Sequence, residues 1–293
     1  MNTPGNKFRD AIADNKPLMV VGAINAYCAK MAEKAGHKAL YLSGAGVANA
    51  SFGLPDLAIT TLNDVAEDSR RITQATNLPL LIDIDTGFGG AFSISRTIKE
   101  MIAADVAAVH IEDQVTQKRC GHRPNKSLVD KIEMTDRIKA AVDARTDDSF
   151  FIMARTDSYA SEGIQGAIDR CNEYISAGAD GLFLEAVSSL EDYKQLKDAL
   201  QVPLLANITE FGKTPLFSAQ ELASVGVDIM LFPLSAFRAM NKAAESVYID
   251  IAENGSQVNS VEKMQTRDEL YEYLNYHSFE QKLDELFKRK ENK

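Results

Sequence analysis

The stretch LLIDIDTGFGGAFSISRTIKEMIAADVAAVHIED, residues 80–113, decides the fold. It opens with a short apolar run (80–85), continues into an amphipathic helical pattern (93–104) and returns to a second apolar run (107–112). Apolar runs without polar alternation are typical of strands that are buried on both faces, as in parallel sheets. The stretch therefore predicts two parallel strands joined by a helix.

The same unit recurs along the chain. The apolar runs expected to form strands are 19–24, 39–42, 80–85, 107–112, 150–155, 181–185, 203–208 and 229–232. Helical patterns lie between them at 61–77, 93–104, 131–145, 164–177 and 188–200. Several helices are followed by a glycine turn, as at Gly36, Gly178 and Gly226, because glycine adopts the left-handed conformation that ends a helix. Eight such units predict an α/β fold, a (β/α)8 barrel of the TIM type.

A doubly wound open sheet is the alternative fold. Gly44 and Gly46 resemble the start of a dinucleotide-binding loop, but the third glycine position holds Asn49. Residues 51–55 are also expected to interrupt any helix there. We therefore expect one barrel domain over residues 1–293, in which residues 238–293 form an additional C-terminal helical extension.

Composition narrows the class of protein. The chain has 293 residues, with 42 acidic and 32 basic side chains and a formal net charge of −10. This balance argues against non-specific nucleic-acid binding. No apolar run approaches the roughly 20 residues that span a bilayer, and residues 1–16 lack the apolar core of a secretory signal. Three widely spaced cysteines indicate a reducing compartment, so a cytoplasmic location is expected.

Polar side chains gather where the predicted strands end. They are Ser43 and Gly44, Asp83 and Asp85, Glu112 and Asp113, Arg155 and Asp157, Glu185, Asn207 and Thr209, and Ser235 and Arg238. Chemistry in such barrels sits at the C-terminal ends of the strands. Charged groups are costly inside an apolar core unless they are paired or bind an ion. The set as a whole therefore indicates a functional site.

Asp83 and Asp85 form the sharpest local pair. Side chains alternate along a strand, so both carboxylates are expected on one face, where they repel each other unless a cation lies between them. Carboxylates without His or Cys nearby suit Mg²⁺ or Mn²⁺, and Glu112 is expected to reach the same ion. The alternative is an ion pair with a strand-end arginine such as Arg155.

The loop after the fourth strand, residues 114–130, is the second unusual feature. It carries Lys118, Arg119, Cys120, His122, Arg123 and Lys126 in an acidic protein. Cationic neighbours lower the pKa of a thiol, and loops of this length are often active-site lids. We therefore interpret residues 114–130, called the lid below, as a closure that bears an acid–base cysteine and anion-binding cations. The alternative is a solvated basic loop.

The run KRCGH (118–122), together with DID (83–85) and Ser43-Gly44, resembles the isocitrate lyase and phosphoenolpyruvate mutase superfamily. Residues 41–44, 53–56, 118–126, 154–157 and 232–240 fit as well, so the resemblance spans nearly the whole chain. Ala45 departs mildly from a run that is usually glycine-rich. Isocitrate lyases typically read KKCGH and are considerably longer, whereas the mutase, phosphonopyruvate hydrolase and oxaloacetate decarboxylase branches lack the cysteine lid.

The resemblance implies a role for each of these positions. Asp83 and Asp85 would hold Mg²⁺, with Glu112 in its water shell, and Mn²⁺ is an expected substitute. The implied catalytic residues are Cys120, Tyr41 and Arg155. The implied substrate-binding residues are Ser43, Gly44, Ala45, Asp56, Lys118, Arg119, Cys120, Gly121, His122, Arg155, Glu185, Asn207, Ile208, Thr209, Arg238 and Arg267.

The resemblance also implies an activity. The expected reaction is the Mg²⁺-dependent cleavage of 2-methylisocitrate to pyruvate and succinate, in the methylcitrate cycle of propionate catabolism. Cys120 would give the succinate carbanion its proton, whereas Tyr41, Asp56 and a metal-bound water are all candidates for the base at the substrate hydroxyl. Homotetramers that exchange C-terminal helices are expected, with no nucleic-acid or membrane partner. The alternatives are isocitrate or another 2-oxo or 2-hydroxy acid as substrate, and a carboxylate-binding barrel without turnover.

Overall fold

A closed barrel of eight parallel strands forms the centre of the chain. The computed structural model describes residues 3–121, 123 and 125–288. The strands are β1 (Leu18–Gly22), β2 (Ala39–Leu42), β3 (Leu80–Asp83), β4 (Ala108–Glu112), β5 (Phe151–Thr156), β6 (Gly181–Leu184), β7 (Leu204–Asn207) and β8 (Ile229–Phe232). Each pairs with the next, and β1 closes on β8 through Leu18 and Ile229. The structure confirms the predicted (β/α)8 barrel.

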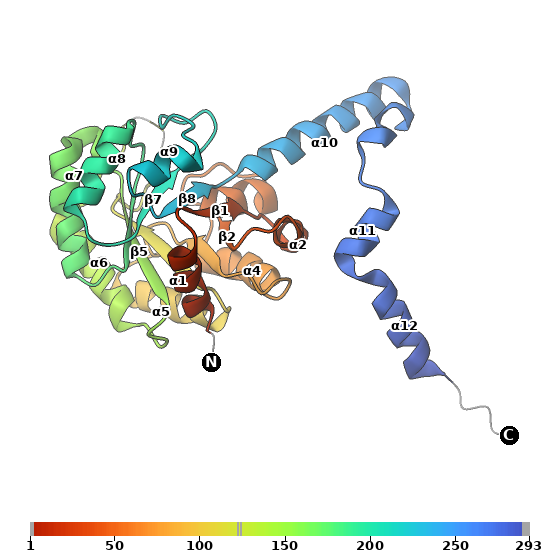
Figure 1. The fold of residues 1–293 in the computed structure, drawn as a ribbon, viewed down its shortest axis with the longest axis horizontal. Coiled ribbons are helices and arrows are strands. Elements are labelled where there is room, and N and C mark those ends of the chain that lie inside the picture. The colour runs from red at the N-terminus through yellow and green to blue at the C-terminus, as the bar shows by residue number, and fades with distance from the viewer. Residues whose placement is uncertain (1–2, 122, 124, 289–293) are drawn as a thin grey trace. The chain divides into compact units, whose positions relative to one another are not determined.

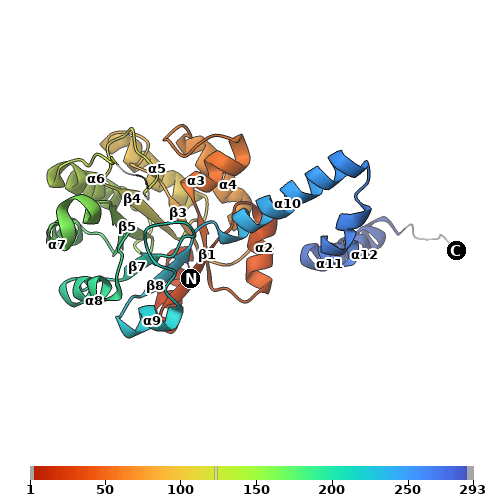
Figure 2. The ribbon, with the colours of Figure 1, turned by 90° about the horizontal axis from the view of Figure 1, so that it is seen from above.

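Helices surround the strands, as Figures 1 and 2 show from two directions. They are α1 (Pro4–Asp14), α2 (Ala26–Lys34), α3 (Gly44–Gly46), the π-helix η1 (Val47–Ser51), α4 (Leu62–Thr73), α5 (Ala91–Ala103), α6 (Lys131–Asp143), α7 (Tyr159–Ser176), α8 (Leu190–Ala199) and α9 (Ala219–Ser224). Their apolar faces pack on the outer side of the strands in one large cluster. A second cluster fills the barrel interior, where Phe8 of α1 meets the ring of Phe151 edge-on with centroids 5.4 Å apart.

Two local expectations concern where helices end. The helix-ending glycines are confirmed, since Gly36 and Gly178 have φ values of 94° and 105°. The interruption expected at residues 51–55 is confirmed too, because the helical segment of α3 and η1 runs from Gly44 only to Ser51. Val47 and Ala48 of this segment are 1% and 2% exposed. Burial of these side chains outweighs the poor helix propensity of the glycines.

Residues 238–293 form a compact unit of their own, separate from the unit of residues 1–237. The C-terminal elements are α10 (Ser235–Asn254), the 3₁₀-helix η2 (Val258–Lys263), α11 (Arg267–Leu274) and α12 (Tyr276–Phe287). Large apolar side chains such as Tyr248, Phe279 and Phe287 are at least 71% exposed. Exchange of these helices between subunits stays a prediction. Over the described ranges of the chain, every helix is too short or too polar to cross a membrane.

Candidate active site

The carboxylates of Asp83 and Asp85 converge at the end of β3, but not through strand alternation. The strand ends at Asp83, and Asp85 has a left-handed backbone with φ 48°. The turn is held by Asp83 Oδ1, which accepts a hydrogen bond of 2.9 Å from the backbone N–H of Asp85. A Cβ atom on Gly44 would lie 3.1 Å from Asp83 Oδ2 and 3.3 Å from Asp85 Oδ1. The two carboxylates therefore meet beside the bare backbone of Gly44.

Lys118 supplies the positive charge at this point. Its Nζ lies 2.7 Å from Asp85 Oδ1 and 2.5 Å from Asp56 Oδ1, and the side chain is only 4% exposed. Burial works to lower the pKa of Lys118, but the carboxylates of Asp85, Asp83, Glu112 and Asp56 outweigh it and raise the pKa. The cation that the repelling carboxylates require is thus present in the chain itself. The partner of Asp85 is a lid lysine, not Arg155.

The two aspartates have opposite electrostatic settings. Burial and the neighbouring charge of Asp83 raise the pKa of Asp85 to about 6. Burial also works to raise the pKa of Asp83, but His110, Lys118 and Arg155 together hold it below its ordinary value. Asp83 therefore stays ionised, whereas Asp85 takes up a proton more readily.

Arg155, near the end of β5, gathers a second group of carboxylates. Its Nε lies 3.0 Å from Asp157 Oδ2 and 3.3 Å from Glu112 Oε2, and its Nη2 lies 3.1 Å from Glu185 Oε2. The guanidinium carbon sits 4.9 Å from the centroid of the Phe183 ring. A delocalised cation stacked on an aromatic face is suited to holding several carboxylates in fixed directions.

Glu112 is the least satisfied of these groups. It is fully buried, and neither of its carboxylate oxygens has a hydrogen-bond partner in the part of the chain that the structure describes. Burial raises the pKa of Glu112 well above its ordinary value, with Arg155 opposing this. A buried carboxylate whose oxygens accept no hydrogen bond is what a cation in addition to Arg155 would stabilise.

The donor chemistry of Asp83, Asp85 and Glu112 fits a hard divalent ion, since all three offer carboxylate oxygens. Within residues 3–121, 123 and 125–288, however, no three His, Cys, Asp or Glu side chains are gathered closely enough to hold a metal ion. Lys118 stands among the carboxylates instead. The metal set therefore stays a prediction, supported by the donor chemistry and the unused oxygens of Glu112.

The lid rests on the floor of the site. Its base is closed by a bridge between Gln114 and Leu128. Lys126 Nζ donates to the backbone oxygen of Gly121 (2.6 Å) and to Asp157 Oδ1 (2.5 Å). A Cβ atom on Gly121 would lie 2.4 Å from Arg155 Nη2, so only glycine allows this approach.

The basic side chains of the lid meet carboxylates of the barrel. Lys118 and Lys126 each pair with site carboxylates. The structure thus supplies counter-charges for the lid from the barrel itself. Arg119 and Cys120 are exposed, whereas His122 lies outside the described residues.

His110 and its partner Tyr41 form a buried pair, and the sequence analysis gave His110 no role. The phenol oxygen of Tyr41 lies 2.8 Å from His110 Nε2, and Nδ1 of the same ring lies 3.7 Å from Asp83 Oδ1. Burial lowers the pKa of His110 to about 4 and raises that of Tyr41 well above its ordinary value. The signal was present in the sequence, because His110 precedes Glu112 by two positions on one strand.

The remaining predicted residues lie where β2 and β7 end or in the C-terminal unit. Ser43 is buried where β2 ends, and next to it the backbone N–H of Gly44 donates to Asp83 Oδ2 at 3.3 Å. At the end of β7, Asn207 Nδ2 donates to Glu185 Oε1 at 3.2 Å, and Ile208 and Thr209 are buried beside it in sequence. Ala45 is partly buried. Arg238 and Arg267 belong to the C-terminal unit, so their place in the site stays a prediction.

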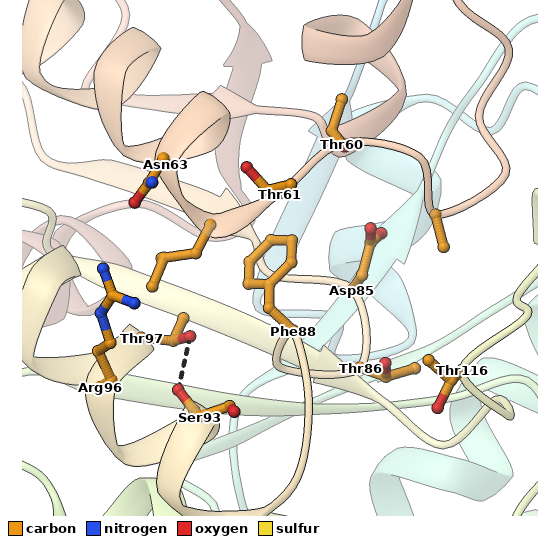
Figure 3. A pocket seen from close by; sticks show the side chains of 12 residues that line it. Thr60, Thr61, Asn63, Asp85, Thr86, Phe88, Ser93, Arg96, Thr97 and Thr116 are labelled. Atoms are coloured by element: carbon orange, nitrogen blue, oxygen red, sulfur yellow. Dashed lines mark hydrogen bonds between the residues drawn. The ribbon is translucent and has the colours of Figure 1, made fainter.

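A cavity of about 360 Å³ opens beside Asp85 (Figure 3). Hydroxyl and amide side chains dominate its lining, which comprises Ala58, Thr60, Thr61, Leu62, Asn63, Asp85, Thr86, Phe88, Ser93, Arg96, Thr97 and Thr116. In the view of Figure 3, Arg96 and Asn63 lie toward one end and Asp85 toward the other, with the ring of Phe88 between them. Asp85 is the one predicted site residue in this lining, so the cavity adjoins the predicted metal set rather than the predicted substrate-binding set.

Comparison with known proteins is consistent with this site. Residues 8–252 match the phosphoenolpyruvate phosphomutase family. The 2-methylisocitrate lyase of Vibrio cholerae serotype O1 is 61% identical over 97% of this chain and 94% of its own. The solved structure of a 2,3-dimethylmalate lyase superposes with a TM-score of 0.89 at 34% identity, covering 98% of this chain and 96% of the other. A phosphonopyruvate hydrolase solved with oxalate and Mg²⁺ has a TM-score of 0.85 at 25% identity, covering 98% and 100%.

Proposed function

The chain belongs to the phosphoenolpyruvate phosphomutase family, and from this premise we propose that it cleaves 2-methylisocitrate to pyruvate and succinate. It is an enzyme, a carbon–carbon lyase. The observation that best supports this substrate is the 61% identity to a 2-methylisocitrate lyase over nearly the full chain. The cysteine lid supports it, because a thiol on a loop that rests against Arg155 suits the protonation of a carbanion.

The chemistry begins at the substrate hydroxyl. Removal of its proton leaves an alkoxide, whose electron pair forms the carbonyl of pyruvate as the adjacent C–C bond breaks. The bonding pair passes to the succinate fragment, where the neighbouring carboxylate delocalises it. The Cys120 thiol then gives its proton to that carbon and is left as a thiolate. Arg155 holds the charge that develops on the fragment, because a fixed cation in a buried site stabilises developing negative charge.

Tyr41 and His110 form the pair best placed to take the hydroxyl proton. The raised pKa of Tyr41 keeps its phenol protonated, so it accepts the substrate proton only by passing its own to His110 Nε2 at 2.8 Å. Asp83 Oδ1, 3.7 Å from Nδ1, favours the imidazolium that results. Asp56 is less suited to this task because it is already paired with Lys118. The proton thus moves from the substrate to Tyr41 and from Tyr41 to His110.

A divalent ion fits the same proposal. Asp83 and Asp85 would hold Mg²⁺, with Glu112 nearby, and Mn²⁺ is the expected substitute. When bound, such an ion supplies Lewis-acid stabilisation of the alkoxide and the carboxylate of the future pyruvate. The chain's own contribution is to orient the carboxylates: the Asp83–Asp85 turn and the contact with Gly44 fix their directions before any ion binds.

Substrate binding falls to the remaining residues of the set. Ser43, Gly44 and Ala45 offer backbone and hydroxyl donors for one carboxylate, and Arg119, His122, Asn207 and Thr209 are proposed to bind the others. Phe183 is buried beneath Arg155, and Leu231 lies in the barrel interior. We propose that the side chains of Phe183 and Leu231 line the pocket that receives the substrate methyl group. A methyl group in a fitted pocket contributes roughly 10- to 200-fold in selectivity.

A pyruvate-release assay with 2-methylisocitrate and isocitrate side by side tests the function. We expect the first to be cleaved with a kcat/KM roughly 10- to 200-fold higher than the second. Equal values would indicate a different branch of the superfamily. Absence of pyruvate from both, in a protein that still binds them, would favour a carboxylate-binding barrel without turnover.

We also propose a homotetramer and a cytoplasmic location. The assembly is supported by the exposed apolar side chains of α10–α12, among them Tyr248, Phe279 and Leu283. Monomers rarely expose so many apolar side chains. Sedimentation of a Phe279→Glu/Leu283→Glu variant should give a smaller particle than the unaltered chain. The same particle size for both would remove these side chains from the interface.

A further inference from the structure

We propose that Lys118 is a built-in counter-cation of the metal carboxylates, and that a divalent ion displaces it from Asp85 and thereby loosens the lid. This inference rests on the metal site of the proposed function. The added consequence is that the ion loosens the lid before the substrate binds and is cleaved. The lid is then released by the ion and closed again by the substrate.

The position of Lys118 is the first support. Lysine is among the residues least often fully buried, and here it is 4% exposed with its ammonium shared between Asp56 and Asp85. The negative charges of Asp83 and Glu112 also act on its ammonium, so Lys118 is a cation under the influence of four carboxylates. A buried carboxylate cluster requires a positive partner, and in the chain by itself this lysine provides it.

The contact with Asp85 makes the two cations competitors. Nζ lies 2.7 Å from Asp85 Oδ1, which is hydrogen-bond distance. A divalent ion bound to the same oxygen would bring two positive charges close together in a site of low dielectric, where they repel strongly. The carboxylate can therefore serve the ammonium or the metal, but not both at this distance. Asp56 remains available to either.

The second support is that Lys118 belongs to the lid. Two residues separate it from Gly121, which rests against Arg155 and Glu185. The Lys118 contacts are one clasp on the lid. A second clasp is the ion pair between Lys126 and Asp157, which does not involve Asp85. Loss of the Lys118–Asp85 contact would leave Lys118 held by Asp56 alone and so loosen the segment that bears Cys120, while the second clasp would keep residues 126–130 anchored.

The third support is the cavity of Figure 3. It reaches Asp85 through side chains such as Thr60, Thr86 and Thr116. Lys118 and Cys120 are absent from its lining. A hydrated cation thus has a route to Asp85 that passes hydroxyl side chains and bypasses Lys118 and Cys120.

Limited trypsin digestion tests the coupling, since the lid offers Lys118, Arg119 and Lys126 as cleavage points, whereas Arg123 precedes a proline and resists trypsin. We expect Mg²⁺ or Mn²⁺ alone to speed cleavage within residues 114–130 by at least about tenfold relative to chelator-treated protein. In Lys118→Gln, cleavage at the remaining positions should be fast without metal and unchanged by it. Mn²⁺ binding, followed by electron paramagnetic resonance, should be at least about tenfold tighter in this variant, because the competing charge is gone.

Two further variants serve as controls. Lys118→Arg keeps a cation at the site and should keep the response to metal. Lys126→Gln breaks the other clasp, so its lid should be cleaved faster throughout but still respond to metal.

Several outcomes would overturn the proposal. It fails if metal alone slows lid cleavage or leaves it unchanged, or if Lys118→Gln binds Mn²⁺ no more tightly than the unaltered chain. Failure of the unaltered chain to bind Mn²⁺ would overturn both this inference and the metal site. Normal Mn²⁺ binding and pyruvate release with an unresponsive lid would overturn this inference alone.

Discussion

The phenol oxygen of Tyr41 lies 2.8 Å from Nε2 of His110, and the two rings are stacked with an interplanar angle of 15°. Because burial lowers the pKa of His110 to about 4, the imidazole is neutral at pH 7. The phenol, with its raised pKa, then donates to Nε2 and leaves the ring proton on Nδ1, facing Asp83. One hydrogen bond thus fixes the histidine tautomer and links the barrel interior to the carboxylate of Asp83.

Tyr41→Phe and His110→Asn should each lower kcat by about 10²-fold or more, the range for a positioned proton carrier. Because the two residues act as one relay, the double variant should be no worse than the worse single variant. Tyr193→Phe is the matched control, since Tyr193 is also fully buried, on α8, and its hydroxyl has no hydrogen-bond partner among the described residues. Steady-state pyruvate release measures all four. Independent, multiplying losses would argue against a relay.

Cys120→Ser should lower kcat by about 10²- to 10⁴-fold while ligand Kd changes little. A hydroxyl is a far weaker acid than a thiol and cannot readily protonate the carbanion. Cys28→Ser and Cys171→Ser are the controls, because both thiols are buried whereas Cys120 is exposed. A thiol alkylating agent should inactivate the unaltered chain and both controls, with pyruvate and succinate slowing the loss. Retention of most of kcat in Cys120→Ser would show that the proton comes from elsewhere.

Gly121→Ala should displace the lid and lower kcat/KM, because the new methyl group would lie 2.4 Å from Arg155 Nη2 and 2.5 Å from Glu185 Oε2. Gly90→Ala is the matched control: a Cβ atom there meets nothing within 4 Å. We expect faster proteolysis of the lid only in Gly121→Ala, with the unfolding temperature close to that of the control. Equal activity of the two variants would mean that the lid does not rest on Arg155 during turnover.

Affinity for Mn²⁺ should fall as the pH drops below about 6. The pKa of Asp85 is raised to about 6, so below that value a proton competes with the cation for the carboxylate. The apparent Kd should rise by up to about tenfold for each further pH unit, and it should be nearly constant above pH 7. An aspartate of ordinary pKa would show this change only below about pH 4. Binding measured between pH 5 and 8 checks this, and a flat profile down to pH 5 would contradict it.

The strands were predictable because each is a near-continuous apolar run. All eight predicted runs overlap their strands with shifts of at most two residues at either end, and β2 and β8 match fully. The first run, 19–24, extends two residues beyond β1 (Leu18–Gly22), and the third ends two residues after Asp83. Such ends depend on turn geometry, here the left-handed backbone of Asp85, which composition does not reveal.

The pairings within the site were harder to predict. The strand ends identified which side chains share one edge, but the partner of Asp85 comes from the lid, 33 positions later in the chain. Which cation meets which carboxylate depends on how a long loop folds back, and no local pattern encodes that. His110 was missed for another reason: a single histidine in an apolar run reads as core, although its ring contacts both Tyr41 and Asp83.

The closure of β1 on β8 has a consequence for synthesis on the ribosome. Leu18 pairs with Ile229, so the first strand waits for its second neighbour until almost the whole barrel has been translated. At about 5–20 residues per second this takes roughly 10–40 s, during which β1 presents an unpaired edge. Partial products that lack β8 would retain that edge and with it a route to aggregation. The nascent chain therefore loses this exposed strand edge only when β8 has been translated and pairs with β1.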